Sequence, residues 1–129
     1  MNDCVSLEIA KILKEEGFNW PCDFFYAKLY DIVISTDDTT YSKVVYENLE
    51  EGDILVPSLW DAYKWLREKH NIFVNVICNS TNEWYYSISI FNSIACVILK
   101  HSENSYKTYE EALESGILKA LKQKWHGWQ

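Results

Sequence analysis

The stretch Asn71–His101, NIFVNVICNSTNEWYYSISIFNSIACVILKH, decides the fold. It contains three short apolar runs separated by the polar turns Asn79–Asn82 and Asn92–Ser93, which is the pattern of an antiparallel meander. The middle run alternates two sets of side chains, Trp84, Tyr86, Ile88 and Ile90 against Tyr85, Ser87, Ser89 and Phe91. This alternation predicts a strand with one apolar face toward a core and one mostly polar face toward solvent.

The segment Ser105–Trp125 predicts a helix after the meander. Thr108 and Glu111 form a capping box at its start. Apolar and small side chains then recur at helical spacing in one stripe: Tyr109, Ala112, Leu113, Gly116, Ile117, Ala120 and Leu121. The small residues of this stripe allow the helix to lie close against a sheet.

The segment Pro57–His70, PSLWDAYKWLREKH, predicts a second helix directly before the meander. Ser58 and Asp61 form its capping box. One line of side chains defines its expected core face: Leu59, Ala62, Tyr63 and Leu66. Trp60 and Trp65 lie on either side of this line, so we expect both to be boundary residues.

The N-terminal part of the chain predicts a helix followed by a hairpin. Ser6 is the expected N-cap of the helix and Gly17 its C-terminal stop. The aromatic and β-branched stretch from Asp23 to Ile34 predicts a bent strand, and residues 43–49 predict a second strand that pairs with it. Together the elements predict a single α+β domain over residues 1–129. Its antiparallel sheet would comprise the hairpin and the meander, with three helices mainly on one face.

The net charge of −7 is concentrated in one segment. From Asp31 to Asp61 there are eight acids and one base, whereas the rest of the chain is balanced. We expect no direct nucleic-acid binding, because phosphate contacts need Lys and Arg. The acids fit a basic protein partner, or they keep a small domain soluble. The carboxylates singled out as interaction candidates are Asp37, Asp38, Glu50 and Glu51.

Aromatic residues make up 16% of the chain and include six tryptophans, more than packing of so small a domain requires. Binding hot spots are enriched in Trp, Tyr and Arg. The interaction candidates of this kind are Trp20, Trp60, Trp65, Tyr85, Trp128 and Arg67, which is the single arginine. Boundary packing with an exposed ring edge is the alternative explanation for the aromatic surplus.

The sequence shows no recognisable catalytic or metal-binding motif. The histidines His70, His101 and His126 share no motif with a cysteine, and Asp37-Asp38 lacks the spaced oxygen ligands of a calcium loop. The cysteines Cys4, Cys22, Cys78 and Cys96 lack zinc spacing. We therefore expect no enzyme, no metal and no cofactor, and we expect Cys78 and Cys96 to be small core residues of strands.

The first residues, MNDCVSLEIAKILKEEG, lack the basic leader and continuous apolar stretch of a signal peptide. No apolar run in the sequence approaches the length that spans a bilayer. We therefore expect a cytoplasmic protein with free thiols and no membrane contact. Asn79-Ser80-Thr81 matches a glycosylation acceptor and is interpreted instead as a plain turn.

Two stretches, VPSLWDAYKWLREKHNIFVNVI and YKTYEEALESGILKALK, resemble a family of small uncharacterised proteins of bacteriophages, prophages and mobile elements of gut bacteria. The first matches the form P-[ST]-L-x-x-A-x-x-W-[LF]-R-E-x-[HK] of that family, and the second matches a closing helix similar to YEEALEAG. The matching residues are Pro57, Ser58, Leu59, Ala62, Trp65, Leu66, Arg67, Glu68 and His70, then Tyr109, Glu110, Glu111, Ala112, Leu113, Glu114 and Gly116. The resemblance implies a phage-related protein of a bacterial host cell and one compact domain, and it supplies no catalytic residues.

These observations predict a non-enzymatic accessory protein that binds a host macromolecule, such as an acidic inhibitor or counter-defence protein. The alternative is a small-molecule or nucleotide binder, in which aromatic rings stack on a base and the polar face around Ser87 and Ser89 lines the site. A homodimer through the open sheet face or an edge strand is compatible with either function.

Overall fold

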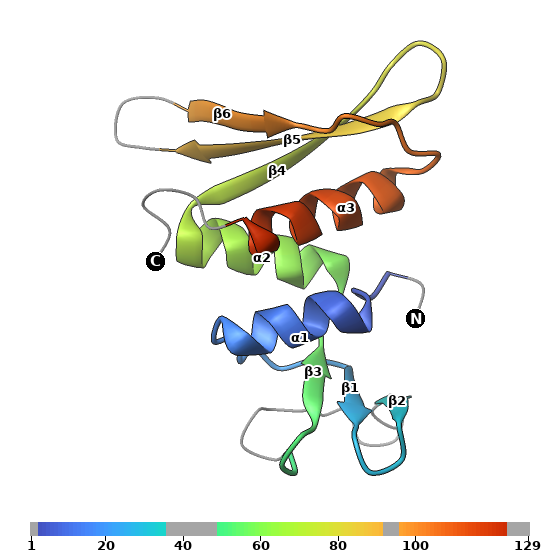
Figure 1. Cartoon of the computed structure of the whole chain (residues 1–129), viewed down its shortest axis with the longest axis vertical. Helices are drawn as coiled ribbons and strands as arrows, with labels where there is room; N and C mark the ends of the chain where they lie inside the picture. The colour runs from blue at the N-terminus through green and yellow to red at the C-terminus, as the bar shows by residue number, and fades with distance from the viewer. Residues whose placement is uncertain (1–2, 36–48, 92–95, 124–129) are drawn as a thin grey trace. The chain divides into compact units, whose positions relative to one another are not determined.

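The computed structural model describes residues 3–35, 49–91 and 96–123, and the chain divides into two compact units, Met1–Trp60 and Asp61–Gln129 (Figure 1). Within the described residues there are three helices and two three-stranded antiparallel sheets, so the expected α+β class is confirmed. The strands form two separate sheets, whereas one sheet was expected. A single domain over residues 1–129 stays a prediction.

The first unit begins with α1, Leu7–Glu15. Ser6 caps it as predicted, because its side chain accepts a hydrogen bond from the Ile9 N–H at 3.2 Å. Gly17 follows the helix with a φ of 97°, a left-handed conformation that suits glycine. The predicted limits of this helix are therefore confirmed.

The expected strand from Asp23 to Ile34 is wrong, because the chain folds back within it. β1 covers Phe24–Ala27 and β2 covers Ile32–Ser35, and the two pair antiparallel with Phe25 opposite Ile34. β3, Ile54–Val56, was not predicted; it pairs with the other side of β1, which gives the order β2-β1-β3. The second strand predicted at residues 43–49 lies almost entirely outside the described residues.

α2, Leu59–His70, begins directly after Ser58, as predicted. Its core face differs from the prediction in two respects. Leu59, Ala62 and Leu66 are buried, but Trp65 is also buried, with 2% of its surface exposed, and Tyr63 is half-buried. Trp65 follows Ala62 at i+3 and therefore belongs to the same helical face. Its assignment as a boundary residue is wrong.

The second unit contains the predicted meander: β4, Ile72–Cys78; β5, Trp84–Phe91; and β6, Cys96–His101. β5 lies between β4 and β6, and β4 opposes β5 without a register shift. The turn at Asn79–Asn82 is confirmed, with Asn82 at a φ of 62° and the Asn79 N–H bonded to the Glu83 carbonyl. The turn predicted at Asn92–Ser93 lies outside the described residues.

α3, Tyr109–Lys122, packs on one face of this sheet (Figure 1). The Thr108 side chain accepts from the Glu111 N–H at 3.1 Å, so the predicted cap is confirmed. The predicted stripe is buried from Ala112 to Leu121, with Tyr109 half-buried. A Cβ placed on Gly116 would lie 2.5 Å from Cγ1 of Val74, which explains a glycine at the contact of α3 with β4.

Two side chains of the meander depart from their predicted environments. Cys78 is exposed and is not a core residue, because it is the last residue of β4, next to the polar turn. Ser89 is 1% exposed although it lies on the face predicted to be polar and solvated. The side chain of Cys96 lies outside the described residues, as do residues 124–129 with Trp125, His126 and Trp128.

Candidate partner-binding groove

An open groove of about 520 Å³ lies in the first unit. Its described lining has an apolar part and an acidic part. The apolar residues come from β1, β2 and the turn between them: Phe25, Ala27, Leu29, Tyr30 and Ile34. The acidic residues come from the turn before β3: Glu50, Glu51 and Asp53. No lysine or arginine belongs to this described lining, so apolar surface and negative charge meet in one concave site.

The turn between β1 and β2 presents the most exposed part of the apolar lining. The Asp31 N–H donates to the Ala27 carbonyl at 2.8 Å, and Asp31 has a φ of 55°. The Tyr26 hydroxyl donates to the Asp31 carboxylate at 2.5 Å, and this bond raises the pKa of Tyr26. The turn leaves Leu29 84% and Tyr30 67% exposed, which is unusual for two large apolar side chains in sequence.

Asp53 joins this turn to the acidic turn. Its Oδ1 accepts from the Lys28 N–H at 3.1 Å, and its Oδ2 accepts from the Glu50 N–H at 3.3 Å. The Asp53 side chain is buried and uses its two oxygens on backbone donors, so it is a positioning residue. Gly52, with a φ of 91°, makes the bend, and a Cβ there would lie 2.6 Å from Cδ of Lys28.

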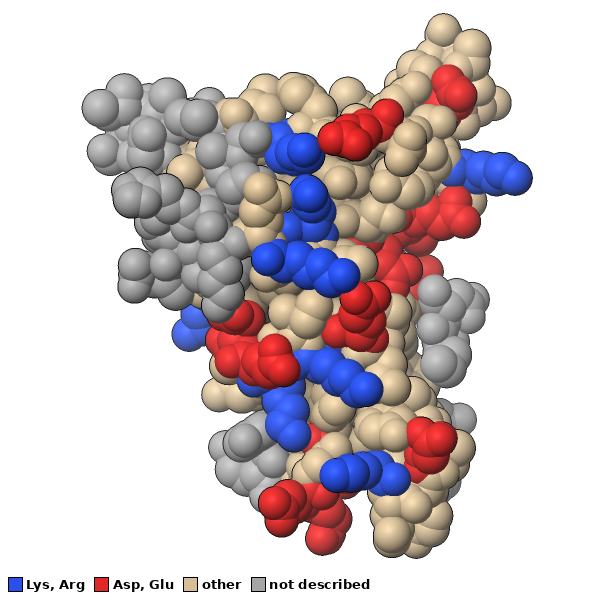
Figure 2. All heavy atoms as spheres, in the orientation of Figure 1, with Lys and Arg blue, Asp and Glu red and all other residues tan. Residues whose placement is uncertain are grey.

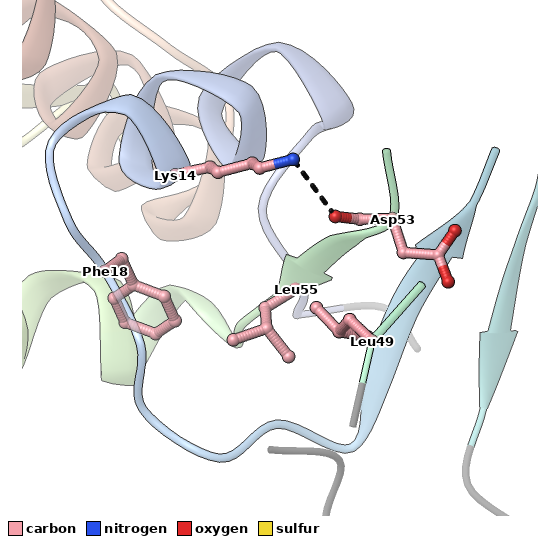
Figure 3. Close-up of a pocket in the computed structure, with 5 residues that line it drawn as sticks. All are labelled: Lys14, Phe18, Leu49, Asp53 and Leu55. Carbon is pink, nitrogen blue, oxygen red and sulfur yellow. Dashed lines mark hydrogen bonds between the residues drawn. The ribbon is translucent and has the colours of Figure 1, made fainter. Parts of the chain in front are cut away.

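The other side of the acidic turn is held by α1. Lys14 Nζ donates to the Asp53 carbonyl at 3.3 Å, while Phe18, Leu49 and Leu55 enclose the apolar side of a small hollow (Figure 3). The hollow has no room for a water molecule, so it is a packing junction and not a ligand site. This junction fixes Asp53, and Asp53 fixes the backbone from which Glu50 and Glu51 project.

Glu50 and Glu51 are the sequence-predicted site residues that the structure places in the groove, and both are exposed. On the face shown in Figure 2, acidic and basic side chains are interspersed. The apolar residues beside the two glutamates were missed by sequence reasoning. Lys28-Leu29-Tyr30-Asp31 has no Gly or Pro, and Asp31 is the single turn signal.

None of the remaining candidates that the structure describes is among the residues lining this groove. Asp37 and Asp38 lie outside the described residues. Trp60 is 58% exposed, whereas Trp65 is buried with its ring edge-on to His70 at 5.0 Å. The Arg67 guanidinium lies 5.0 Å from the centre of the Tyr63 ring, a cation–π contact within α2.

Tyr85, Ser87 and Ser89 lie on the face of the second sheet that is opposite to α3. Asn75 opposes Ser87 across β4 and β5, and its amide donates to the Ser89 hydroxyl at 3.4 Å. Asn75, Ser87 and Ser89 therefore lie together on this face. Trp65 is buried and offers no ring surface for base stacking, and Ser89 is buried and offers no polar surface to a ligand.

Within residues 3–35, 49–91 and 96–123, no group of three His, Cys, Asp or Glu side chains is arranged to hold a metal ion. No helix in those ranges has the length and apolar character needed to cross a membrane. Comparison with protein-family models, with curated proteins and with solved structures gives no match. The groove is the feature of the described structure on which a function can be argued.

Proposed function

We propose that this protein is a non-enzymatic accessory protein that binds a basic, partly apolar segment of another protein in the groove of the first unit. The observation that carries the proposal is the pairing of exposed Leu29 and Tyr30 with the carboxylates of Glu50 and Glu51 in one concavity. Apolar contact supplies binding free energy, and opposite charge supplies orientation and a faster encounter.

The resemblance to phage and prophage proteins supports a bacterial cytoplasmic setting for this binding and a host protein as the partner. In this role the protein would inhibit or redirect its partner by occupying a basic surface. The net charge of −7 supports the same direction of recognition, because it attracts basic surfaces over a distance and repels acidic ones.

A peptide that alternates lysine with leucine is a suitable probe for this groove, with a peptide that alternates glutamate with leucine as the control. Fluorescence anisotropy of the labelled peptides measures the affinity. We expect the lysine peptide to bind and its affinity to fall with added salt. Binding of both peptides with equal affinity would contradict a charge-selective groove.

Two double variants locate the binding. Glu50→Lys with Glu51→Lys reverses the charge of the groove, and we expect the affinity for the lysine peptide to fall roughly tenfold, about 1.4 kcal/mol. Glu68→Lys with Glu103→Lys makes the same change of charge at exposed positions of the second unit that do not line the groove. Equal loss in both variants would show a net-charge effect only and would contradict the proposed site.

A host-lysate capture with the same variants then tests the biological claim. A host protein retained by the wild type and by the Glu68/Glu103 variant, but lost from the Glu50/Glu51 variant, supports the proposal. A protein retained equally by all three binds elsewhere on the molecule and contradicts it.

A further inference from the structure

The groove of the first unit combines an exposed aromatic side chain with two exposed carboxylates. Tyr30 is 67% exposed although it lines the groove. Glu50 and Glu51 are exposed lining residues as well. Within residues 3–35, 49–91 and 96–123, neither of these two carboxylates takes part in a hydrogen bond or an ion pair. A tyrosine ring and two carboxylates are therefore open to one bound ligand.

Two contacts hold the turn between β1 and β2 against the acidic turn. The Asp53 carboxylate accepts from the Lys28 N–H at 3.1 Å and from the Glu50 N–H at 3.3 Å. A Cβ placed on Gly52 would lie 2.6 Å from Cδ of Lys28, so the stem of this lysine crosses the acidic turn. Among the described residues, Lys28 forms no ion pair with Glu50 or Glu51. The ring and the carboxylates are thus carried by two turns in direct contact.

A guanidinium group suits this combination better than an ammonium group does. Guanidinium is planar and weakly hydrated, so its face stacks on an aromatic ring while the N–H donors at its edge reach carboxylate oxygens. The lysine ammonium is a compact and strongly hydrated point charge without a flat face. In an open groove of about 520 Å³ water competes for either cation, and the weaker hydration of guanidinium favours arginine.

We propose that arginine is the basic residue that this groove recognises, with its guanidinium stacked on Tyr30 and hydrogen-bonded to Glu50 and Glu51. The methylene stem of the arginine lies along the apolar lining at Leu29. This preference rests on the proposed function, since it names the residue of the basic partner that the groove selects. It distinguishes two side chains of equal charge, which attraction by net charge alone does not do.

Two alternating peptides of equal length and charge, one of arginine with leucine and one of lysine with leucine, measure the preference. Their affinities for the full chain are determined by fluorescence anisotropy. We expect the arginine peptide to bind the wild type about threefold to fivefold more tightly, which is the size of an exposed cation–π contact. The readout is the ratio of the two affinities, because a variant that weakens binding in general lowers both and leaves the ratio unchanged.

Three variants test whether this ratio depends on the ring of Tyr30. Tyr30→Leu keeps an apolar side chain at an exposed position, and we expect it to bring the ratio close to one. Tyr30→Phe keeps the ring and is expected to retain the preference. Tyr85→Leu replaces a half-buried tyrosine of the second unit that does not line the groove, and it is also expected to retain the preference.

Proton NMR of the bound arginine peptide gives a geometric readout of the same contact. Stacking on the face of a ring shifts the δ-methylene protons of arginine upfield through the ring current. We expect this shift with the wild type and with Tyr30→Phe, and we expect it to be absent with Tyr30→Leu.

The possible failures have different meanings. Equal affinity of the two peptides for the wild type would overturn the arginine preference and leave the proposed groove intact. A preference that persists in Tyr30→Leu, or one that is lost equally in Tyr85→Leu, would show that the Tyr30 ring is not its source. Failure of both peptides to bind would contradict the proposed function itself, and the arginine preference with it.

Discussion

Trp60 and Trp65 are five residues apart in sequence and have opposite environments in the structure. Trp65 is 2% exposed and Trp60 is 58% exposed. Both tryptophans were predicted to lie at the boundary of the core, because the core line was drawn through Tyr63. The helical face actually widens around Ala62 to include Trp65 and Leu66, and a large ring at i+3 is accommodated there. Periodicity located this face, but it did not define how wide the buried part is.

Replacement of these tryptophans by alanine should therefore have unequal effects on stability. We expect Trp65→Ala to lower the free energy of unfolding by about 3–5 kcal/mol, because it leaves a large cavity. Trp60→Ala is expected to cost less than about 1 kcal/mol. Urea unfolding followed by circular dichroism measures both values. Similar losses in the two variants would mean that Trp65 does not have the buried role described here.

Glu83 is held by its neighbours in the Asn79–Asn82 turn. Its Oε1 accepts from the Asn79 amide at 3.1 Å and lies 3.0 Å from the Thr81 hydroxyl. These hydrogen bonds, with Asn79 contributing most, lower the pKa of Glu83. Because folding lowers the pKa of Glu83, these hydrogen bonds stabilise the folded protein at pH values above the ordinary glutamate pKa. This stabilisation is lost as the pH falls through the pKa that Glu83 has in the folded state.

An NMR titration of the Glu83 carboxyl group tests this assignment. We expect a midpoint below that of an ordinary glutamate, and we expect the Thr81→Val variant to move the midpoint upward, since it removes one donor. Ser105→Ala removes a longer contact of 3.4 Å to Oε2 and should move it less. A midpoint that is unchanged in Thr81→Val would rule out the hydroxyl as a cause of the shift.

At the scale of elements, those with strong local signals were predicted correctly. The caps at Ser6 and Thr108, the stop at Gly17 and the alternation in β5 each depend on residues close together in sequence. The hairpin of β1 and β2 was missed because its turn contains no Gly or Pro, and β3 was missed because three residues before Pro57 are too few for a periodic pattern. The groove was therefore unpredictable, since its acidic and apolar parts meet through β1, β2 and the turn before β3.

The contact of α3 with the second sheet yields a prediction about Gly116. Alanine is the better helix former by about 1 kcal/mol, but the added methyl group would meet Val74 at 2.5 Å and Tyr86 at 3.1 Å. Overpacking of this kind costs about 1–3 kcal/mol, so we expect Gly116→Ala to be destabilised despite its helix propensity. Ser115→Ala, one position earlier, is the control. A thermal melt in which Gly116→Ala gains as much as Ser115→Ala would contradict the close packing.

At the scale of the whole molecule, composition indicated a partner of opposite charge, and the structure shows where part of that charge lies. Glu50 and Glu51 are placed beside exposed apolar side chains by the bonds of Asp53 to the backbone of Lys28 and Glu50. Sequence alone singled out both glutamates, but it did not single out Leu29 or Tyr30 beside them. The tryptophans of α2 were among the aromatic candidates, whereas Leu29 and Tyr30 are the large side chains that share the groove with the carboxylates.

The most direct test of the binding claim is an NMR titration of the isotopically labelled protein with the lysine–leucine peptide, followed by amide chemical-shift changes. We expect the largest changes at Leu29, Tyr30, Glu50 and Glu51, with α3 unchanged apart from indirect effects. Changes centred on residues that do not line the groove, or none at saturating peptide, would contradict the claim that this groove is the binding site.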